Sequence, residues 1–245
     1  MKRPALRLVL PGLLVCFSSE ACLAFRPFDG TDAAVADPGE TEVELQPLGY
    51  LRQGADHVLV APGARINYGF VDAWEAVIEG AWSHGVSAGS GGSSLAANAF
   101  SLKHVWRDGF LQEKPGPSVA SEFALLLPGI GADNGTGGSV AGIVSNRWGW
   151  LTVHVNAVAA VTRQQHGDLF LGAIVEGPRE WTVRPVAEVF RERDFGGPAT
   201  TSGLVGAIWQ VGERLALDAA YRRARSDGHT ADELRLGVTF SFGLR

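Results

Sequence analysis

The residue types that could carry out acid–base or metal chemistry are few and scattered along the chain. None of its six histidines stands at the spacing from another that a zinc site requires. His154 is the one of interest, because it lies two residues before Asn156 in an alternating segment. A histidine beside an asparagine can orient a serine nucleophile for hydrolysis. The competing interpretation is an interior polar residue that forms a hydrogen bond across the fold.

Three other patterns give no firmer site. Ser83-His84 is an adjacent pair, and successive residues of a strand point to opposite faces, so the two side chains do not share a hydrogen bond easily. The segment 133–136 resembles a calcium loop but lacks the terminal acidic ligand, and it fits a loop tip. Both cysteines, Cys16 and Cys22, precede residue 25. We therefore expect no catalytic residue, no metal site and no cofactor, with a lipid-modifying enzyme as the minor alternative.

The charged residues follow a clearer pattern, shown best by the C-terminal segment Glu233–Phe242. Its apolar side chains alternate with polar or small ones, which predicts a strand with one wholly apolar face that ends in Phe240 and Phe242. An ion at the midplane of a bilayer costs roughly 2–4 kcal/mol, so charges confined to the other face predict a water-facing barrel interior. The residues predicted to line this lumen are Glu42, Glu44, Arg65, Glu75, Glu79, Lys103, Glu122, His154, Arg184, Glu188, Asp218, Arg222, Glu233 and Arg235, and Arg214 is assigned to the same face.

Twelve such segments can be assigned along the chain. Each has about ten residues, the length that a tilted strand needs to cross a bilayer, and an even number of strands is usual for bacterial barrels. The expected strands are Thr41–Leu51, His57–Phe70, Ala73–His84, Leu95–Trp106, Ser118–Leu127, Ser139–Asn146, Gly149–Thr162, Asp168–Glu176, Glu180–Arg191, Thr200–Val211, Arg214–Arg223 and Glu233–Phe242. The last strand is expected to close on the first, with Arg222 and Arg235 facing Glu42 and Glu44.

The connections alternate between short turns and longer loops, as in outer-membrane barrels. One connection departs from this rule, because Asp108–Pro117 is long for a periplasmic turn. Either a strand boundary is misplaced there or the periplasmic loop is extended. Pro62 and Pro185 fall inside expected strands, and each should lie at a bulge or near a strand end because proline has no donor.

The N-terminus predicts export. Lys2, Arg3 and Arg7 precede the apolar run Leu8–Phe17, and small residues follow around a cleavage point after Ala24, which is the pattern of a signal peptide. The net charge of -5 gives no argument for nucleic-acid binding. After the signal peptide no run reaches the roughly 18 uncharged apolar residues of a membrane helix.

The segment between the signal peptide and the first strand carries a family resemblance. The matching residues are Arg26, Pro27, Phe28, Thr31, Asp32, Ala33, Gly39, Glu40 and Glu44. They resemble the start of outer-membrane proteins of the meta-pathway phenol degradation family: an Arg-Pro-Phe element, a Thr-Asp-Asp-Ala-like turn, then Gly-Glu and a Glu-rich strand. The second Asp of the turn is missing here. The resemblance implies an outer-membrane barrel that transports small, often aromatic compounds.

Together these patterns predict an all-β protein with one up-and-down antiparallel transmembrane barrel of about twelve strands. The expected organisation is a signal peptide at 1–24, an irregular periplasmic segment at 25–40 and the barrel at 41–245. We expect a passive channel or uptake protein in the outer membrane, with outer-membrane lipids, the barrel-assembly machinery and a small-molecule cargo as partners. The alternatives are a non-conducting structural barrel, a lipid-modifying enzyme and a soluble periplasmic β-sandwich or lipocalin-like protein.

Overall fold

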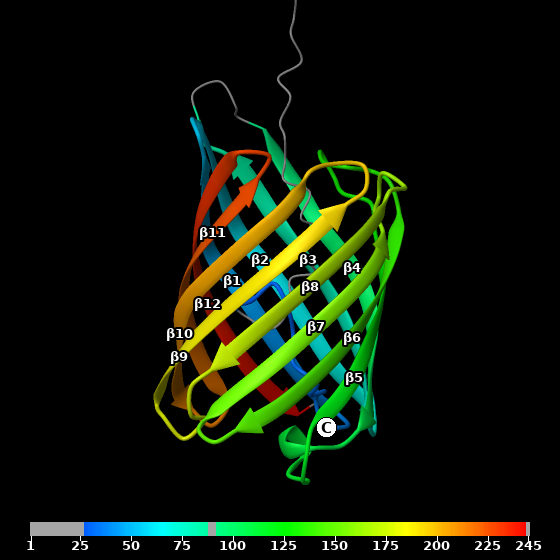
Figure 1. Ribbon diagram of the computed structural model, residues 1–245, viewed down its shortest axis with the longest axis vertical. Helices are drawn as coiled ribbons and strands as arrows, with labels where there is room; N and C mark the ends of the chain where they lie inside the picture. Colours follow the sequence, from blue (N-terminus) through cyan, green and yellow to red (C-terminus); the bar gives the residue numbers. More distant parts are fainter. Residues whose placement is uncertain (1–26, 88–91, 244–245) are drawn as a thin grey trace, which may run out of the picture.

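The computed structural model describes residues 27–87 and 92–243, and its strands form one closed antiparallel barrel (Figure 1). Each strand pairs with its neighbours in sequence, and β1 pairs with β12. The strands are β1 (Glu40–Gln53), β2 (Asp56–Val71), β3 (Trp74–Gly85), β4 (Ser93–Arg107), β5 (Ser118–Leu126), β6 (Gly137–Trp148), β7 (Leu151–Val161), β8 (Gly167–Glu176), β9 (Val183–Asp194), β10 (Ala199–Gly212), β11 (Leu215–Ser226) and β12 (His229–Gly243). The predicted up-and-down barrel of twelve strands is confirmed.

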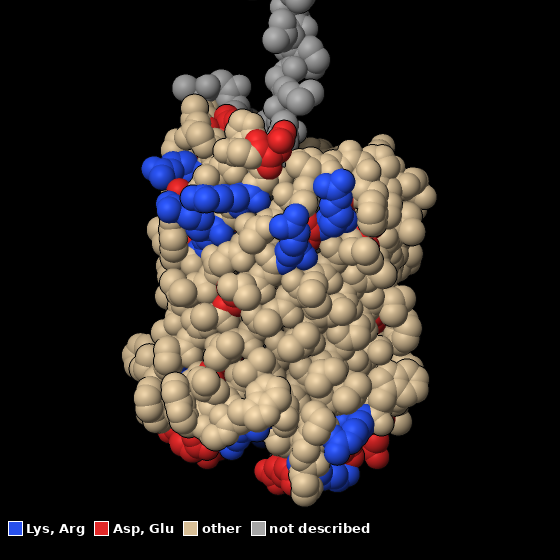
Figure 2. Space-filling view, in the orientation of Figure 1, with Lys and Arg blue, Asp and Glu red and all other residues tan. Residues whose placement is uncertain are grey.

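The wall has the two faces that the alternation predicts. Large apolar side chains on the outward face are exposed, for example Val189 at 63% and Ile78 at 53%, while most charged strand residues on the inward face are buried. In Figure 2 the middle of the drawn face carries few charged atoms, and Lys, Arg, Asp and Glu gather toward its two ends. An apolar band with a polar interior is the arrangement of a wall that contacts lipid. No helix among the described residues is long and apolar enough to cross a membrane.

The two ends of the barrel differ in their connections and side chains. At the lower end of Figure 1, where β1 begins and β12 ends, the connection from β4 to β5 contains the 3-10 helix η1 (Phe110–Gln112). The connection at Asp108–Pro117 is therefore an extended loop rather than a misplaced strand boundary. The same end carries exposed aromatic side chains, as membrane interfaces do: Phe70, Trp106, Trp148, Trp150, Trp181 and Phe242.

Proline and a register break mark the irregular places of the wall. Pro62 lies where the pairing of β2 with β3 shifts between Val60 and Gly63, and Pro185 lies two residues after the start of β9. Both match the expected positions at a bulge and near a strand end. The pairing of β1 with β12 also shifts, between Leu45 and Leu48.

The segment that precedes β1 lies inside the barrel. Residues 27–39, which the sequence analysis placed in the periplasm, run through the lumen and bond to strands on several sides. We call this segment the plug. A segment with so many backbone donors outside any sheet must find acceptors, and the polar lumen wall supplies them. The predicted signal peptide at 1–24 and the final Leu244 and Arg245 lie outside the described residues.

Candidate functional site

The lumen wall brings together the charged residues that the alternation of side chains along each strand predicted to face inward. Twelve of the fourteen are buried, and the other two, Glu42 and Arg184, are partly buried. Arg214 was assigned to the same face wrongly: it lies exposed in the turn between β10 and β11, where strand alternation has ended. Buried lumen acids that the sequence analysis did not include are Asp168, Glu176 and Glu192 on the strands and Asp29 and Asp32 on the plug.

One charge cluster is built on β1 to β5 around Arg65. Its guanidinium group donates to Glu79 at 2.9 Å and to Glu122 at 3.1 Å. The same group donates through Nε to Asn67 at 3.0 Å, and Asn67 in turn donates to Glu44. Register explains the cluster, because Glu44, Arg65 and Glu79 lie opposite one another on three successive strands. Ion pairs between cross-strand neighbours stabilise the packing of β1 to β5.

The second cluster joins the plug to the opposite wall. Arg235 donates to the Asp29 carboxylate at 2.9 Å and to the Pro27 carbonyl at 2.8 Å. Arg222 lies 3.2 Å from the other Asp29 oxygen, and both arginines also bond to Glu233. The plug therefore enters the lumen with a carboxylate held between two guanidinium groups.

This geometry corrects the predicted contact across the seam. Arg235 pairs in register with Gly49, and Glu44 pairs with Thr239, so the two charged groups lie at different heights on the wall. Glu44 contacts Asn67 and Arg65 instead. The expectation that Arg222 and Arg235 face Glu42 and Glu44 assumed a register that sequence alternation does not fix.

Wall side chains accept hydrogen bonds from the plug backbone along its length. The two oxygens of Glu188 accept from the N–H groups of Asp29 and Gly30 at 2.8 and 2.7 Å. Asn156 both accepts from the Thr31 N–H and donates to the Thr31 carbonyl. Further acceptors are Ser145 for Ala33 and Glu75 for Ala36. The donors of an irregular segment are thus satisfied by side chains that the wall projects inward.

Two plug side chains also enter apolar patches of the lumen wall. Phe28 is 2% exposed and belongs to a cluster with Ile174, Val186, Leu204, Ile208 and Ala220. Ala33 is fully buried in a second cluster with Val105, Ala120, Ala141 and Ile143. Inward-facing apolar residues are unexpected in a water-filled lumen, and the plug keeps them from water. Removing this apolar surface from water favours the state in which the plug lies in the lumen.

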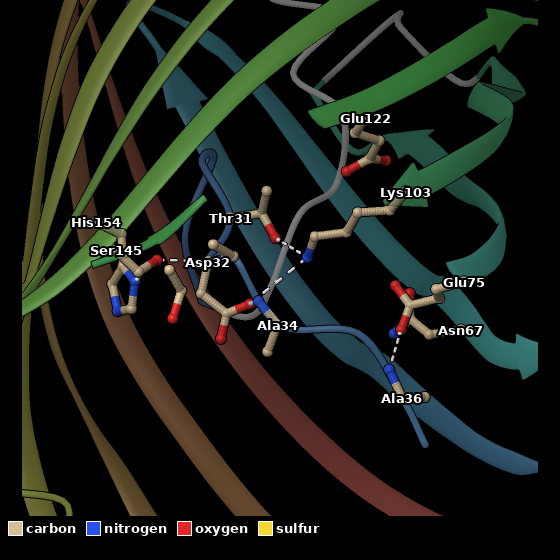
Figure 3. A network of polar contacts seen from close by, with 12 residues as sticks. Thr31, Asp32, Ala34, Ala36, Asn67, Glu75, Lys103, Glu122, Ser145 and His154 are labelled. Carbon is tan, nitrogen blue, oxygen red and sulfur yellow. Dashed lines mark hydrogen bonds and ion pairs between the residues drawn. The ribbon is translucent and has the colours of Figure 1, made fainter. Parts of the chain in front are cut away.

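Lys103 reaches the plug from β4, as Figure 3 shows. Its ammonium group lies 3.3 Å from the Thr31 hydroxyl and 3.5 Å from the Asp32 carboxylate. The plug residues Thr31, Asp32 and Ala33 are part of the family-like motif, and all three contact the wall. The motif is therefore the part of the chain that fits the lumen.

Burial and nearby cations act against each other on the two plug acids. Burial raises the pKa of Asp29, but Arg222 and Arg235 outweigh it and hold that pKa below its ordinary value. Burial likewise raises the pKa of Asp32, and Lys103 is the main group that brings it below the ordinary value. Both carboxylates are therefore ionised at neutral pH, which is what their ion pairs with the wall require.

His154 forms the interior hydrogen bond that was one of its two expected roles. Its Nδ1 lies 2.7 Å from the Ser145 hydroxyl, and its Nε2 lies 3.3 Å from Glu176. A serine, a histidine and a carboxylate in this order are the residue types of a hydrolase triad. The Ser145 hydroxyl is fully buried and already accepts from the Ala33 N–H, so no substrate reaches it in this arrangement. Ser145 bonds to the plug, and His154 lies between Ser145 and Glu176.

A polar cavity remains beside the plug. It has a volume of about 250 Å³, and six acids, three basic residues (Arg65, Lys103 and Arg179) and part of the plug line it. Among the described residues no group of three or more His, Cys, Asp or Glu could hold a metal ion. A polar cavity of this size can hold water and small polar solutes.

Comparison with known proteins identifies the fold. No family model and no curated protein matches the chain. Among solved structures, an outer-membrane channel from Pseudomonas putida F1 aligns with a TM-score of 0.61 at 11% identity, covering 85% of this chain and 97% of that one. The NanC porin aligns at 0.59 and 9% identity, covering 82% and 98%. The KdgM porin in complex with oligogalacturonate aligns at 0.54 and 13% identity, covering 82% and 99%. The chain therefore shares the barrel fold of these porins and channels.

Proposed function

We propose that this protein is a passive outer-membrane channel for small molecules whose lumen is closed by the plug, residues 27–39. One observation carries the proposal. Every strand is paired on both sides without the plug, and the plug bonds to wall side chains rather than to the strand ladders over residues 27–36. The plug can therefore leave while the wall stays closed.

The location in the outer membrane is supported by the surface of the barrel. Its outward apolar band and the aromatic side chains of the lower end match a wall in lipid. A soluble sandwich would bury these apolar faces in its core, and here they point outward. The shared fold with porins supports the same location. The predicted signal peptide would supply the export step.

The chemistry of the plug suggests the class of cargo. When Phe28 and Asp29 leave, they expose an apolar patch next to two guanidinium groups. A small aromatic acid presents the same pair of groups, a ring and a carboxylate, to this site. The resemblance of residues 26–44 to the meta-pathway phenol degradation family supports aromatic cargo and suggests membership of that family.

Single-channel recording in planar bilayers tests the proposal. The wild-type protein should be non-conducting for most of the recording and open at intervals. A variant with residues 27–38 replaced by glycine and serine should conduct steadily. Benzoate should reduce the current of that variant, and adding Arg235→Ala should weaken the block. Heat-modifiable migration in gels checks that both proteins are folded barrels. Absence of current in the folded replacement variant at every voltage would favour the non-conducting structural barrel.

A further inference from the structure

Five arginines point outward near the upper end of one side of the barrel. They are Arg191 and Arg193 on β9, Arg223 and Arg225 on β11, and Arg52 on β1, and all five are exposed. Figure 2 shows Lys and Arg atoms gathered in the upper part of the drawn face, with some Asp and Glu atoms beside and above them. We call these five residues the arginine belt.

The strand register places the belt on one continuous area. Arg225 and Arg191 both pair with Thr201 of β10, from its two sides. Arg223 and Arg52 both pair with Asp232 of β12. Because residues in register across antiparallel strands are neighbours, the belt spans β9 to β12 and closes onto β1 over three successive outward-facing rows of the register.

The belt carries excess positive charge. Asp232 is shared by Arg223 at 2.6 Å, by Arg52 at 3.1 Å and by the Tyr221 hydroxyl. Arg191, Arg193 and Arg225 form no ion pair with any residue in the described ranges 27–87 and 92–243. Asp232 is the one acid paired with the five arginines among the described residues, and Asp194 and Asp227 lie close by at the ends of β9 and β11. The arginines still outnumber these three acids, which favours a multivalent anion, and guanidinium groups bind phosphate in a bidentate manner.

An apolar groove lies directly below the belt on the same strands. It has a volume of about 330 Å³, and its apolar lining includes Leu48, Tyr50, Val205, Ala219, Leu234 and Leu236. Tyr221 and Leu234 pair in register two residues below Arg223 and Asp232, so the next outward-facing row after the belt begins the groove. Ala219 is small and pairs with another alanine, Ala207 on β10, which accounts for the depression in an otherwise filled apolar wall.

We infer that the belt and the groove together form a binding site for one phosphorylated, multiply acylated lipid of the outer leaflet, with the chemistry of lipid A. The belt would hold the phosphate groups at the membrane interface, and the groove would take an acyl chain toward the bilayer centre. Charge complementarity and the order of the two features along the strands carry the inference. It rests on the outer-membrane location in the proposed function, with the upper end facing outward.

Native mass spectrometry of the full barrel in detergent tests the site. The probes are diphosphorylated lipid A, its dephosphorylated form, and phosphatidylethanolamine. The wild type should retain diphosphorylated lipid A preferentially. Replacing Arg191, Arg193 and Arg225 together by alanine should weaken its binding roughly 100-fold, since each basic residue near an anionic lipid surface contributes about fivefold. Ala219→Phe should weaken it without a change in charge.

A charge-matched control replaces Lys114, Arg147 and Arg214, exposed at the lower end, by alanine and should bind as the wild type does. Equal retention of lipid A by the belt variant, or equal binding of the dephosphorylated lipid, would overturn the inference. Conductance measured on the same proteins separates the two proposals. A conducting wild type that shows no lipid preference contradicts only the lipid site, and a lipid-binding barrel without current contradicts only the channel.

Discussion

At the scale of single residues, the alternation of side chains along the strands predicted most of the charged residues that face the lumen. It predicted none of their contacts with the plug. Arg65 and Glu188 could be placed inward because neighbouring apolar residues alternate with them. The bond between Glu188 and Asp29 joins residues 159 apart in the chain. No local periodicity reports on such a contact, and the irregular plug has no periodicity of its own. The one available signal was the family-like motif at residues 26–33.

Glu188→Gln tests how the plug is held. Glutamine has one acceptor oxygen where glutamate has two, so one of the hydrogen bonds to Asp29 and Gly30 is lost. A hydrogen bond contributes about 0.5–1.5 kcal/mol net, so the open fraction in single-channel records should rise about two- to tenfold. Glu192→Gln makes the same substitution further along β9, at a buried side chain without a hydrogen bond to the described plug residues, and should leave gating unchanged. Identical records for both variants would argue against this anchor.

Arg65→Met tests the charge cluster of the wall. The substitution removes the cation that Glu79 and Glu122 share, both of them buried. Breaking a buried ion pair in this way costs about 3–5 kcal/mol, so the free energy of unfolding measured by urea titration in lipid vesicles should fall by a similar amount. Arg147→Met breaks the exposed pair with Glu180, and its effect should stay below about 1 kcal/mol. An Arg65 variant as stable as this control would show that the cluster is dispensable.

At the scale of elements, alternation predicted the number of strands and most of their extents, because a lipid-facing strand must be apolar on one side only. The C-terminal strand β12 follows this pattern and closes on β1 as expected. Alternation could not supply the register. The pairing shifts by one residue between Leu45 and Leu48, around Pro47, which has no donor for the ladder. The charges that had been expected to meet are further apart than this shift, because Arg235 lies opposite Gly49, five residues from Glu44.

Phe240 and Phe242 end β12 on its outward face, with ring centroids 6.3 Å apart. Barrel assembly depends on aromatic residues in the last strand, so we expect the double alanine variant to accumulate less in the outer membrane. Truncation after Phe242 keeps both rings and should be tolerated. Fractionation and heat-modifiable gel migration measure both effects. Normal membrane yield of the double variant would contradict the role given to this strand.

At the scale of the whole molecule, the plug occupies the lumen of the barrel and bonds to its wall on several sides. The fold could be predicted from the sequence because its rule is local and repeats in every strand. The occluded lumen could not, because it depends on one short segment fitting contacts from many strands at once. The proposed channel function depends on that segment leaving the lumen without disturbing the wall.

The occupancy of the lumen can be measured directly by cysteine labelling in intact outer membranes, since the chain after residue 24 contains no cysteine. Ala33→Cys introduces a thiol at a fully buried plug position, and Ala55→Cys introduces one that is exposed in the turn after β1. A small water-soluble maleimide should label the thiol at position 55 rapidly and the thiol at position 33 slowly. Adding Gly30→Val, whose Cβ would lie 3.1 Å from Asn156 and Glu188 atoms, should displace the plug and speed labelling at position 33. Labelling at position 33 as fast as at position 55 in the otherwise wild-type protein would contradict a plug seated in the lumen.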